Sequence, residues 1–110
     1  MANAFKRKLQ RAVGTSATSV GSYTVGAGIQ ATLIGLTVSN ILSTNIVVDV
    51  MLNDGTNDTY IVKGATILPG GALVAVGGDQ KIVLEPNDSI KVQSDTASSC
   101  DVVMSLLEIS

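Results

Sequence analysis

The fold of this chain is decided by the apolar stretch Ile46-Val47-Val48-Asp49-Val50-Met51-Leu52 and by the polar run Asn53-Asp54-Gly55-Thr56-Asn57-Asp58 that follows it. Val48, Val50 and Leu52 alternate with other residues, so a β-strand places all three side chains on one face. The apolar residues between them indicate burial of the other face as well. The polar run contains Asp-Gly, which tolerates the positive φ of a hairpin turn. The sequence therefore predicts a strand, a turn and a second strand over residues 59–63.

Short apolar runs separated by turn residues recur along the rest of the chain after Thr15. Val, Ile and Thr are frequent in these runs, and β-branched side chains fit a pleated, half-buried surface. The further candidate strands are residues 20–25, 31–38, 66–68, 72–76, 81–84, 89–93 and 101–109. The segments between them are rich in Gly, Pro, Asn and Asp, and none is long enough for a crossover helix. The pattern predicts an all-β fold, an antiparallel β-sandwich of the jelly-roll or immunoglobulin-like kind, over residues 15–110.

The first eleven residues differ from the rest of the chain in charge. They hold four of the seven positive side chains, and no acid occurs before Asp49. Because the chain has nine acids, residues 12–110 carry a net charge of −6 against +4 in this leading segment. The protein is thus an acidic body with a basic arm.

The arm has the spacing of a helix. Phe5, Leu9 and Val13 recur every four residues, Asn3 stands at an N-cap position, and Gly14 is placed to end the helix. We therefore expect a short basic helical arm over residues 1–14. A helix of about ten residues is marginal alone in water. The arm is then either a frayed, solvated terminus or an anchor that orders on an acidic partner. The residues assigned to anchoring are Phe5, Lys6, Arg7, Lys8, Leu9, Arg11 and Val13.

Nucleic acid and membrane are disfavoured as partners of the arm. Phe5 is its one aromatic residue, and the acidic body would repel phosphate. No apolar run approaches 18 residues, so no transmembrane helix is expected. The basic start is not followed by an apolar segment, so a secretory signal is not expected either.

No constellation of residues predicts catalysis, a metal site or a cofactor. The chain has no His, which removes imidazole ligands and His-based acid–base chemistry. The polar run at 53–58 lacks the EF-hand spacing, and the Gly pairs at 70–71 and 77–78 lack the Lys-Ser/Thr of a phosphate loop. Turns explain all three segments. The sequence therefore predicts that the protein is not an enzyme.

Cys100 is the only cysteine, so no disulfide can form within the chain. The neighbouring Asp101 would raise the pKa of the thiol, which disfavours a nucleophilic role. We expect a buried or interface thiol, with an intermolecular disulfide as the alternative.

The composition indicates that part of the surface is covered by other proteins. Charged residues make up 15% of the chain, whereas an ordinary globular domain has about 25%. Such a surface suits subunits packed around a symmetry axis. We expect a homo-oligomer, with a trimer favoured.

The sequence also resembles the small virion structural proteins of tailed bacteriophages, and the resemblance covers nearly the whole chain. The segments that carry it are Met1-Ala2-Asn3-Ala4-Phe5-Lys6-Arg7-Lys8-Leu9, Val13-Gly14-Thr15, Val20-Gly21-Ser22-Tyr23-Thr24-Val25, Asp54-Gly55-Thr56-Asn57-Asp58-Thr59-Tyr60, Lys63-Gly64-Ala65, Gly77-Gly78-Asp79-Gln80-Lys81, Val83-Leu84-Glu85-Pro86 and Asp88-Ser89-Ile90-Lys91-Val92. The resemblance implies a non-enzymatic component of the virion, usually homo-oligomeric, and transfers no catalytic residue.

Three functions agree with this resemblance. The leading one is a collar or neck spike that is attached to the head–tail connector through the arm. The second is a capsid decoration protein on the head surface, where the arm would bridge capsid subunits. The third, a receptor-binding module of a tail fibre, is disfavoured because sugar recognition usually needs more exposed aromatic residues than this chain has.

Overall fold

The computed structural model describes residues 3–110, and nearly all of its regular structure is β-strand. The strands are β1 (Asn3–Val13), β2 (Thr18–Ser19), β3 (Gln30–Asn40), β4 (Ile46–Asn53), β5 (Asp58–Ile67), β6 (Ala72–Val76), β7 (Ile82–Leu84), β8 (Ser89–Ser94) and β9 (Cys100–Ile109). A single 3₁₀ turn, η1 (Val20–Ser22), follows β2 within the described residues. The expectation of an all-β fold is confirmed.

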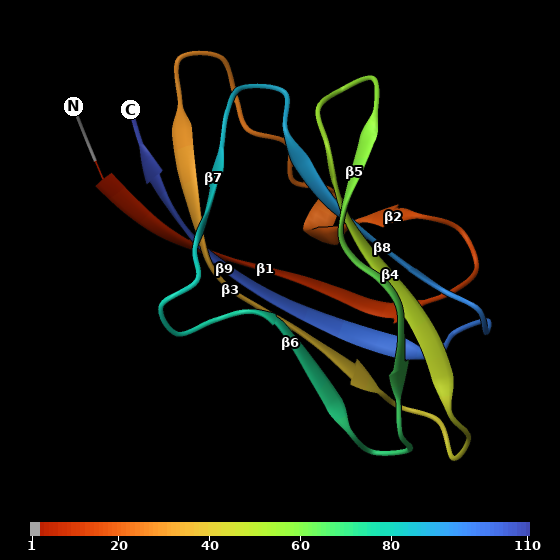
Figure 1. Cartoon of the computed structure of the whole chain (residues 1–110). Coiled ribbons are helices and arrows are strands. Elements are labelled where there is room, and N and C mark those ends of the chain that lie inside the picture. Colours follow the sequence, from red (N-terminus) through yellow and green to blue (C-terminus); the bar gives the residue numbers. More distant parts are fainter. Residues whose placement is uncertain (1–2) are drawn as a thin grey trace.

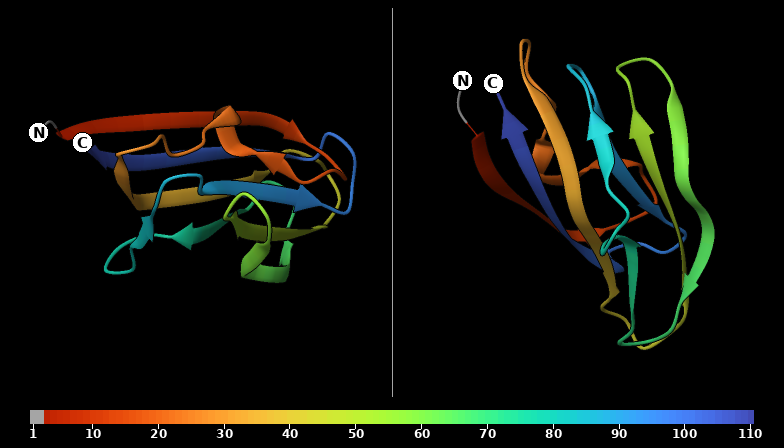
Figure 2. Two further views of the ribbon diagram at one scale, coloured as in Figure 1. Left: turned by 90° about the horizontal axis from the view of Figure 1, so that it is seen from above. Right: turned by 60° about the vertical axis from the view of Figure 1, so that its left-hand side comes forward.

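The strands form two antiparallel sheets (Figure 1). One has five strands in the order β1–β9–β3–β6, with β7 paired to the other half of β3. The second has four strands in the order β2–β8–β4–β5. The beginning of β1 and the end of β9 lie side by side, since Asn3 is paired with Ile109 (Figure 2).

The pairing is nested. With β6 and β7 taken as one interrupted strand, the first strand pairs with the last, the second with the last but one, and so on inward to the β4–β5 hairpin. This is the strand arrangement of a jelly roll, one of the two sandwich types expected from the sequence. The predicted turn lies at its centre. There the Asp54 carboxylate accepts hydrogen bonds from the backbone N–H groups of Thr56 and Asn57, and Gly55 has a φ of 100°.

One hydrophobic core fills the space between the two sheets. The five-stranded sheet contributes Leu33, Val102 and Leu106, and the four-stranded sheet contributes Val48 and Val92. Each of these side chains is at most 1% exposed. The alternation in β8 is as expected, because Ile90 and Val92 are buried while Lys91 and Gln93 are partly exposed. The strand expected over residues 20–25 is wrong, since φ values of 59° at Gly21 and 53° at Ser22 turn the chain there.

The predicted N-terminal helix is wrong: residues 3–13 form strand β1, which is paired along its length with β9. A spacing of four residues is even, so it places Phe5 and Leu9 on one face of a strand as well as on one face of a helix. Edge pairing with β9 supplies backbone hydrogen bonds that a short, isolated helix cannot match in water. The sequence allows both a helix and a strand here, and the pairing with β9 selects the strand. Residues 1 and 2 of the predicted arm lie outside the described residues.

A bulge near the end of β1 separates Val13 from the other apolar residues of this strand. The register with β9 shifts between Gln10 and Val13, and Ala12 has a φ of 51°. The Ala12 N–H donates to the Asp101 carboxylate over 2.9 Å. The shift turns Val13 into the core, where it is 2% exposed.

A buried asparagine holds the loop between β3 and β4. The side-chain amide of Asn40 donates to the carbonyl oxygens of Thr44 and Ile67, over 2.8 and 3.0 Å. Its carbonyl oxygen accepts from the N–H of Leu42 over 2.8 Å. Asn40 is only 3% exposed, so removing its side chain leaves backbone groups that water reaches poorly.

We therefore expect Asn40→Ala to lower the free energy of unfolding by about 2–3 kcal/mol. Asn57→Ala, in the exposed turn between β4 and β5, is the control and should change it by less than about 0.5 kcal/mol. Urea denaturation followed by circular dichroism measures both. Equal midpoints for the two variants would show that the buried amide does not stabilise the loop.

Candidate interaction surface

Apolar side chains form two rows across the five-stranded sheet. The first row follows the pairing from β1 through β9 and β3 to β6, and consists of Leu9, Val103, Thr37 and Val74. The second runs from β1 through β9 and β3 to β7, and consists of Phe5, Leu107, Thr32 and Val83. Because directly paired residues lie on the same face of a sheet, both rows belong to one face.

This face is the outer one, which we call the sheet face. Alternate residues on the same strands, such as Leu33 and Met104, are fully buried in the core. On the outer side Phe5 is 79% exposed, and Val74 and Val83 are each 64% exposed. Nine large apolar side chains are exposed among residues 3–110, and five of them lie on the sheet face: Phe5, Leu9, Val74, Val83 and Val103.

The charges of the sheet face lie at its margins. Its two central strands present no charged side chain on this face over residues 103–109 of β9 and 30–39 of β3. Glu108 is the one charged residue in these segments, and it alternates to the inner side of the sheet together with Leu106. Arg7 lies on edge strand β1, paired with Ser105. Asp101 marks the end of the face next to the bulge. An antiparallel sheet that meets only water normally alternates apolar and polar side chains, so this uncharged centre is unusual.

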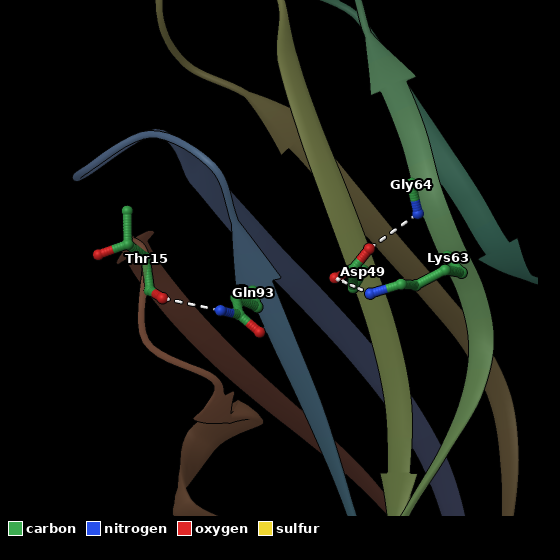
Figure 3. A network of polar contacts seen from close by, with 5 residues as sticks. All are labelled: Thr15, Asp49, Lys63, Gly64 and Gln93. Atoms are coloured by element: carbon green, nitrogen blue, oxygen red, sulfur yellow. Dashed lines mark hydrogen bonds and ion pairs between the residues drawn. The ribbon is translucent and has the colours of Figure 1, made fainter.

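The outer face of the four-stranded sheet has a different character (Figure 3). Asp49 accepts hydrogen bonds from the Lys63 ammonium over 3.3 Å and from the Gly64 N–H over 2.7 Å. Gln93 donates to the carbonyl oxygen of Thr15 over 2.9 Å. This sheet exposes two large apolar side chains, Val47 and Tyr60, against five on the sheet face.

The structure divides the seven residues that the sequence assigned to anchoring. Phe5, Arg7 and Leu9 lie together on the sheet face. Lys6 alternates with them toward the inner side but stays exposed, and Arg11 is exposed within the bulge. The remaining two, Lys8 and Val13, face inward. Sequence reasoning missed Val74, Val83 and Val103, because only the strand pairing brings them beside β1.

The inward side of β1 is held by Tyr23. The Lys8 ammonium lies 5.3 Å from the centroid of the Tyr23 ring, a cation–π contact. The Tyr23 hydroxyl donates a hydrogen bond to the Glu108 carboxylate on β9. Burial raises the pKa of Tyr23, and the hydrogen bond to Glu108 and the negative charge of this carboxylate raise it further. Gln10 adds a contact by accepting from the Gly21 N–H over 3.1 Å.

Cys100 is fully buried beneath the end of β1. It is paired with Val13, and its sulfur lies 4.0 Å from the Val13 carbonyl oxygen. Burial raises the pKa of the thiol to about 11, while the Ser99 hydrogen bond lowers it and the Asp101 charge raises it. The expected buried thiol is found. In this arrangement the sulfur lies out of reach of a second chain, so the alternative of an intermolecular disulfide is not supported.

Within residues 3–110 no three Cys, Asp or Glu side chains gather closely enough to hold a metal ion. A pocket near the chain ends is lined by Gly28, Ile29, Gln30, Pro86, Ile109 and Ser110. The same part of the chain contains no helix long and apolar enough to cross a membrane.

The fold has counterparts among solved structures. A chain of the Bacillus endospore appendages, described as a novel family of disulfide-linked pili, is 13% identical with a TM-score of 0.56, over 99% of this chain and 87% of that chain. A chain of the acidic stable capsid structure of Helicobacter pylori bacteriophage KHP30 is 11% identical with a TM-score of 0.56, over 100% of this chain and 94% of that chain. At these identities the likeness establishes the fold alone. No protein-family model matches the sequence, and no curated protein matches it.

Cys100 also provides a test of whether β1 stays in the sheet. We expect the native protein to resist a small thiol reagent at pH 8, because the thiol is buried and protonated, and to react at once in urea. Mass spectrometry of quenched samples measures the labelled fraction. Labelling of the native protein at the rate of an exposed thiol would show instead that β1 leaves β9 readily.

Proposed function

We propose that this protein is a non-enzymatic structural subunit of a bacteriophage particle that works by association with copies of itself and with a neighbouring virion protein. The observation that carries the proposal is the sheet face, whose uncharged, apolar centre is bordered by a basic edge strand. A domain that remained single in water would leave this apolar area exposed, which soluble monomers rarely do.

Two further observations support a particle component. The sequence resembles small virion proteins of tailed bacteriophages over nearly its whole length. The two structural counterparts, which share the fold across almost all of both chains, come from a pilus and from a phage capsid, which are both assemblies. Jelly rolls occur in capsid proteins and also in lectins, so the fold agrees with this function without requiring it.

For the location we propose a collar or neck spike that is attached to the head–tail connector. Strand β1 would supply the attachment through Phe5, Arg7, Leu9 and Arg11, which are exposed. Lys6 adds charge beside them, while Lys8 and Val13 would hold β1 in place. We therefore still propose that residues 1–14 are the segment that anchors the protein and that residues 15–110 are the sandwich domain that it attaches.

The alternative is a capsid decoration protein on the head surface, which would use the same apolar face to bridge neighbouring capsid subunits. A receptor-binding module of a tail fibre is a weaker third candidate. Tyr60 is its best point of support, being 47% exposed with the Lys63 ammonium 4.5 Å from its ring centroid. The copy number per particle separates the first two, since tens of copies favour the neck and hundreds favour the shell.

The proposed anchoring predicts a charge effect that depends on position. Lys6→Gln combined with Arg11→Gln should reduce the occupancy of the protein on the particle several-fold, because the edge that meets an acidic partner loses two charges. Lys63→Gln combined with Lys91→Gln removes the same charge from the opposite sheet and should leave the occupancy unchanged. Quantitative mass spectrometry of purified particles measures both. Equal occupancy for the two variants would overturn anchoring through β1.

The number of copies that associate is a separate part of the proposal. The low proportion of charged residues favours a trimer or a higher ring. Light scattering on the purified chain measures the mass directly, and a single chain at every concentration would remove the argument from composition.

A further inference from the structure

We infer that the sheet face is self-complementary and packs against the sheet face of a second copy, about a two-fold axis parallel to the strands and between β9 and β3. The inference rests on the proposed function for its setting in a particle. It assigns Phe5, Arg7 and Leu9 to the contact with a second copy of this chain, so attachment of the pair to a neighbouring virion protein would use the exposed basic side chains Lys6 and Arg11. It follows from where the rows and the charges lie across the sheet.

The apolar rows match under this rotation. A half-turn about an axis along the strands exchanges the two edges of the sheet and keeps each row opposite itself. Leu9 of one copy then lies over Val74 of the second, and Phe5 lies over Val83. Aligned sheets pack with their strands about 30° apart, which displaces an edge residue by about 4 Å. This displacement is smaller than the separation between the two rows, about 13 Å for four residues along a strand.

The charges favour a two-fold axis parallel to the strands over a two-fold axis perpendicular to them, which also lies in the plane of the face. Arg7 lies between the two rows on the β1 edge, opposite Ser105. At the same level on the far edge, the loop between β6 and β7 carries Asp79. The rotation brings Arg7 toward Asp79 of the second copy. A two-fold axis perpendicular to the strands would instead place β1 over β1 and bring Arg7 against its own copy.

The two edges of the sheet face also carry net charges of opposite sign. Strand β1 carries two positive side chains, Arg7 on its outward side and Arg11 exposed within the bulge, where the Asp101 carboxylate of β9 also lies. The far edge carries Asp79, Lys81 and Glu85, with a net charge of −1. The Lys81 ammonium is directed to the carbonyl oxygen of Gly78, at 2.9 Å within its own loop. Opposite margins favour a packing in which each β1 meets the far edge of the other copy.

The size of the face is sufficient for a stable pair. Four strands about 4.8 Å apart and about ten residues long cover roughly 20 by 30 Å, or about 600 Å² in each copy. A pair would then bury roughly 1,200 Å², which is the lower limit for specific protein–protein interfaces. We therefore expect an equilibrium between single and paired chains that depends on concentration. Two-fold pairing also agrees with a trimer, since two trimers joined by such contacts form a closed hexamer.

Sedimentation equilibrium of the purified chain, with two matched variants, tests the inference. Val103→Asp places a charge in the middle of the face and should reduce the mass to that of one chain, or of one trimer if the parent is a hexamer. Leu68→Asp, at a loop residue that is 64% exposed, should behave like the parent. Circular dichroism melts establish that both variants fold. A parent of one or three chains at every concentration would overturn the pair, as would a Val103→Asp variant with unchanged mass.

Charge reversal tests the axis. Arg7→Asp and Asp79→Arg should each weaken association by about fivefold, and the double variant should restore it, because the two residues meet only across the proposed axis. Failure of the double variant to restore association would overturn this axis.

Particle occupancy, measured separately, decides the proposed function. A chain that pairs in solution but is absent from purified particles would overturn the virion role and leave the pair intact. A parent that stays single, with a Val103→Asp variant that no longer enters particles, would assign the face to another virion protein and overturn the pair.

Discussion

The structure depends on the backbone pairing of β9, which lies between β1 and β3 and hydrogen-bonds to both. This one strand joins the beginning of the chain to its middle, and its alternate residues close the core through Val102, Met104 and Leu106. The same alternation directs Val103 and Leu107 outward. The outward apolar residues and the core residues thus belong to the same strand. A strand that reads as apolar on both sides normally lies between two layers, and here the second layer is missing from a single chain.

Sequence reasoning succeeded where the pattern was local. The hairpin at Asp54-Gly55 and the alternation through Ile90 and Val92 depend on neighbouring residues, and both are found in the structure. It failed at residues 3–13, because a spacing of four fits a helix and a strand equally and the outcome depended on a partner strand about a hundred residues away. It also treated the basic segment as the whole candidate surface. Val74 and Val83 look like ordinary strand residues until the register places them in rows with Leu9 and Phe5.

Stability and interaction are divided between the two sides of β1. Lys8 and Gln10 fix the strand to Tyr23 and Gly21, so deleting the strand would remove structural contacts together with any anchoring contact. Substitutions at Phe5, Arg7 or Leu9 leave those inner contacts in place. Point changes on the outer side are consequently the informative way to study association in this protein.

The nested pairing also sets an order for folding during synthesis. Strand β9 follows all the other strands in the sequence, and until it has left the ribosome, β1 and β3 lack the strand that lies between them. The β4–β5 hairpin can form early, whereas the five-stranded sheet must wait for β9. A nascent chain therefore carries two long, unpaired strand edges until β9 emerges, and this is a period of exposure to aggregation.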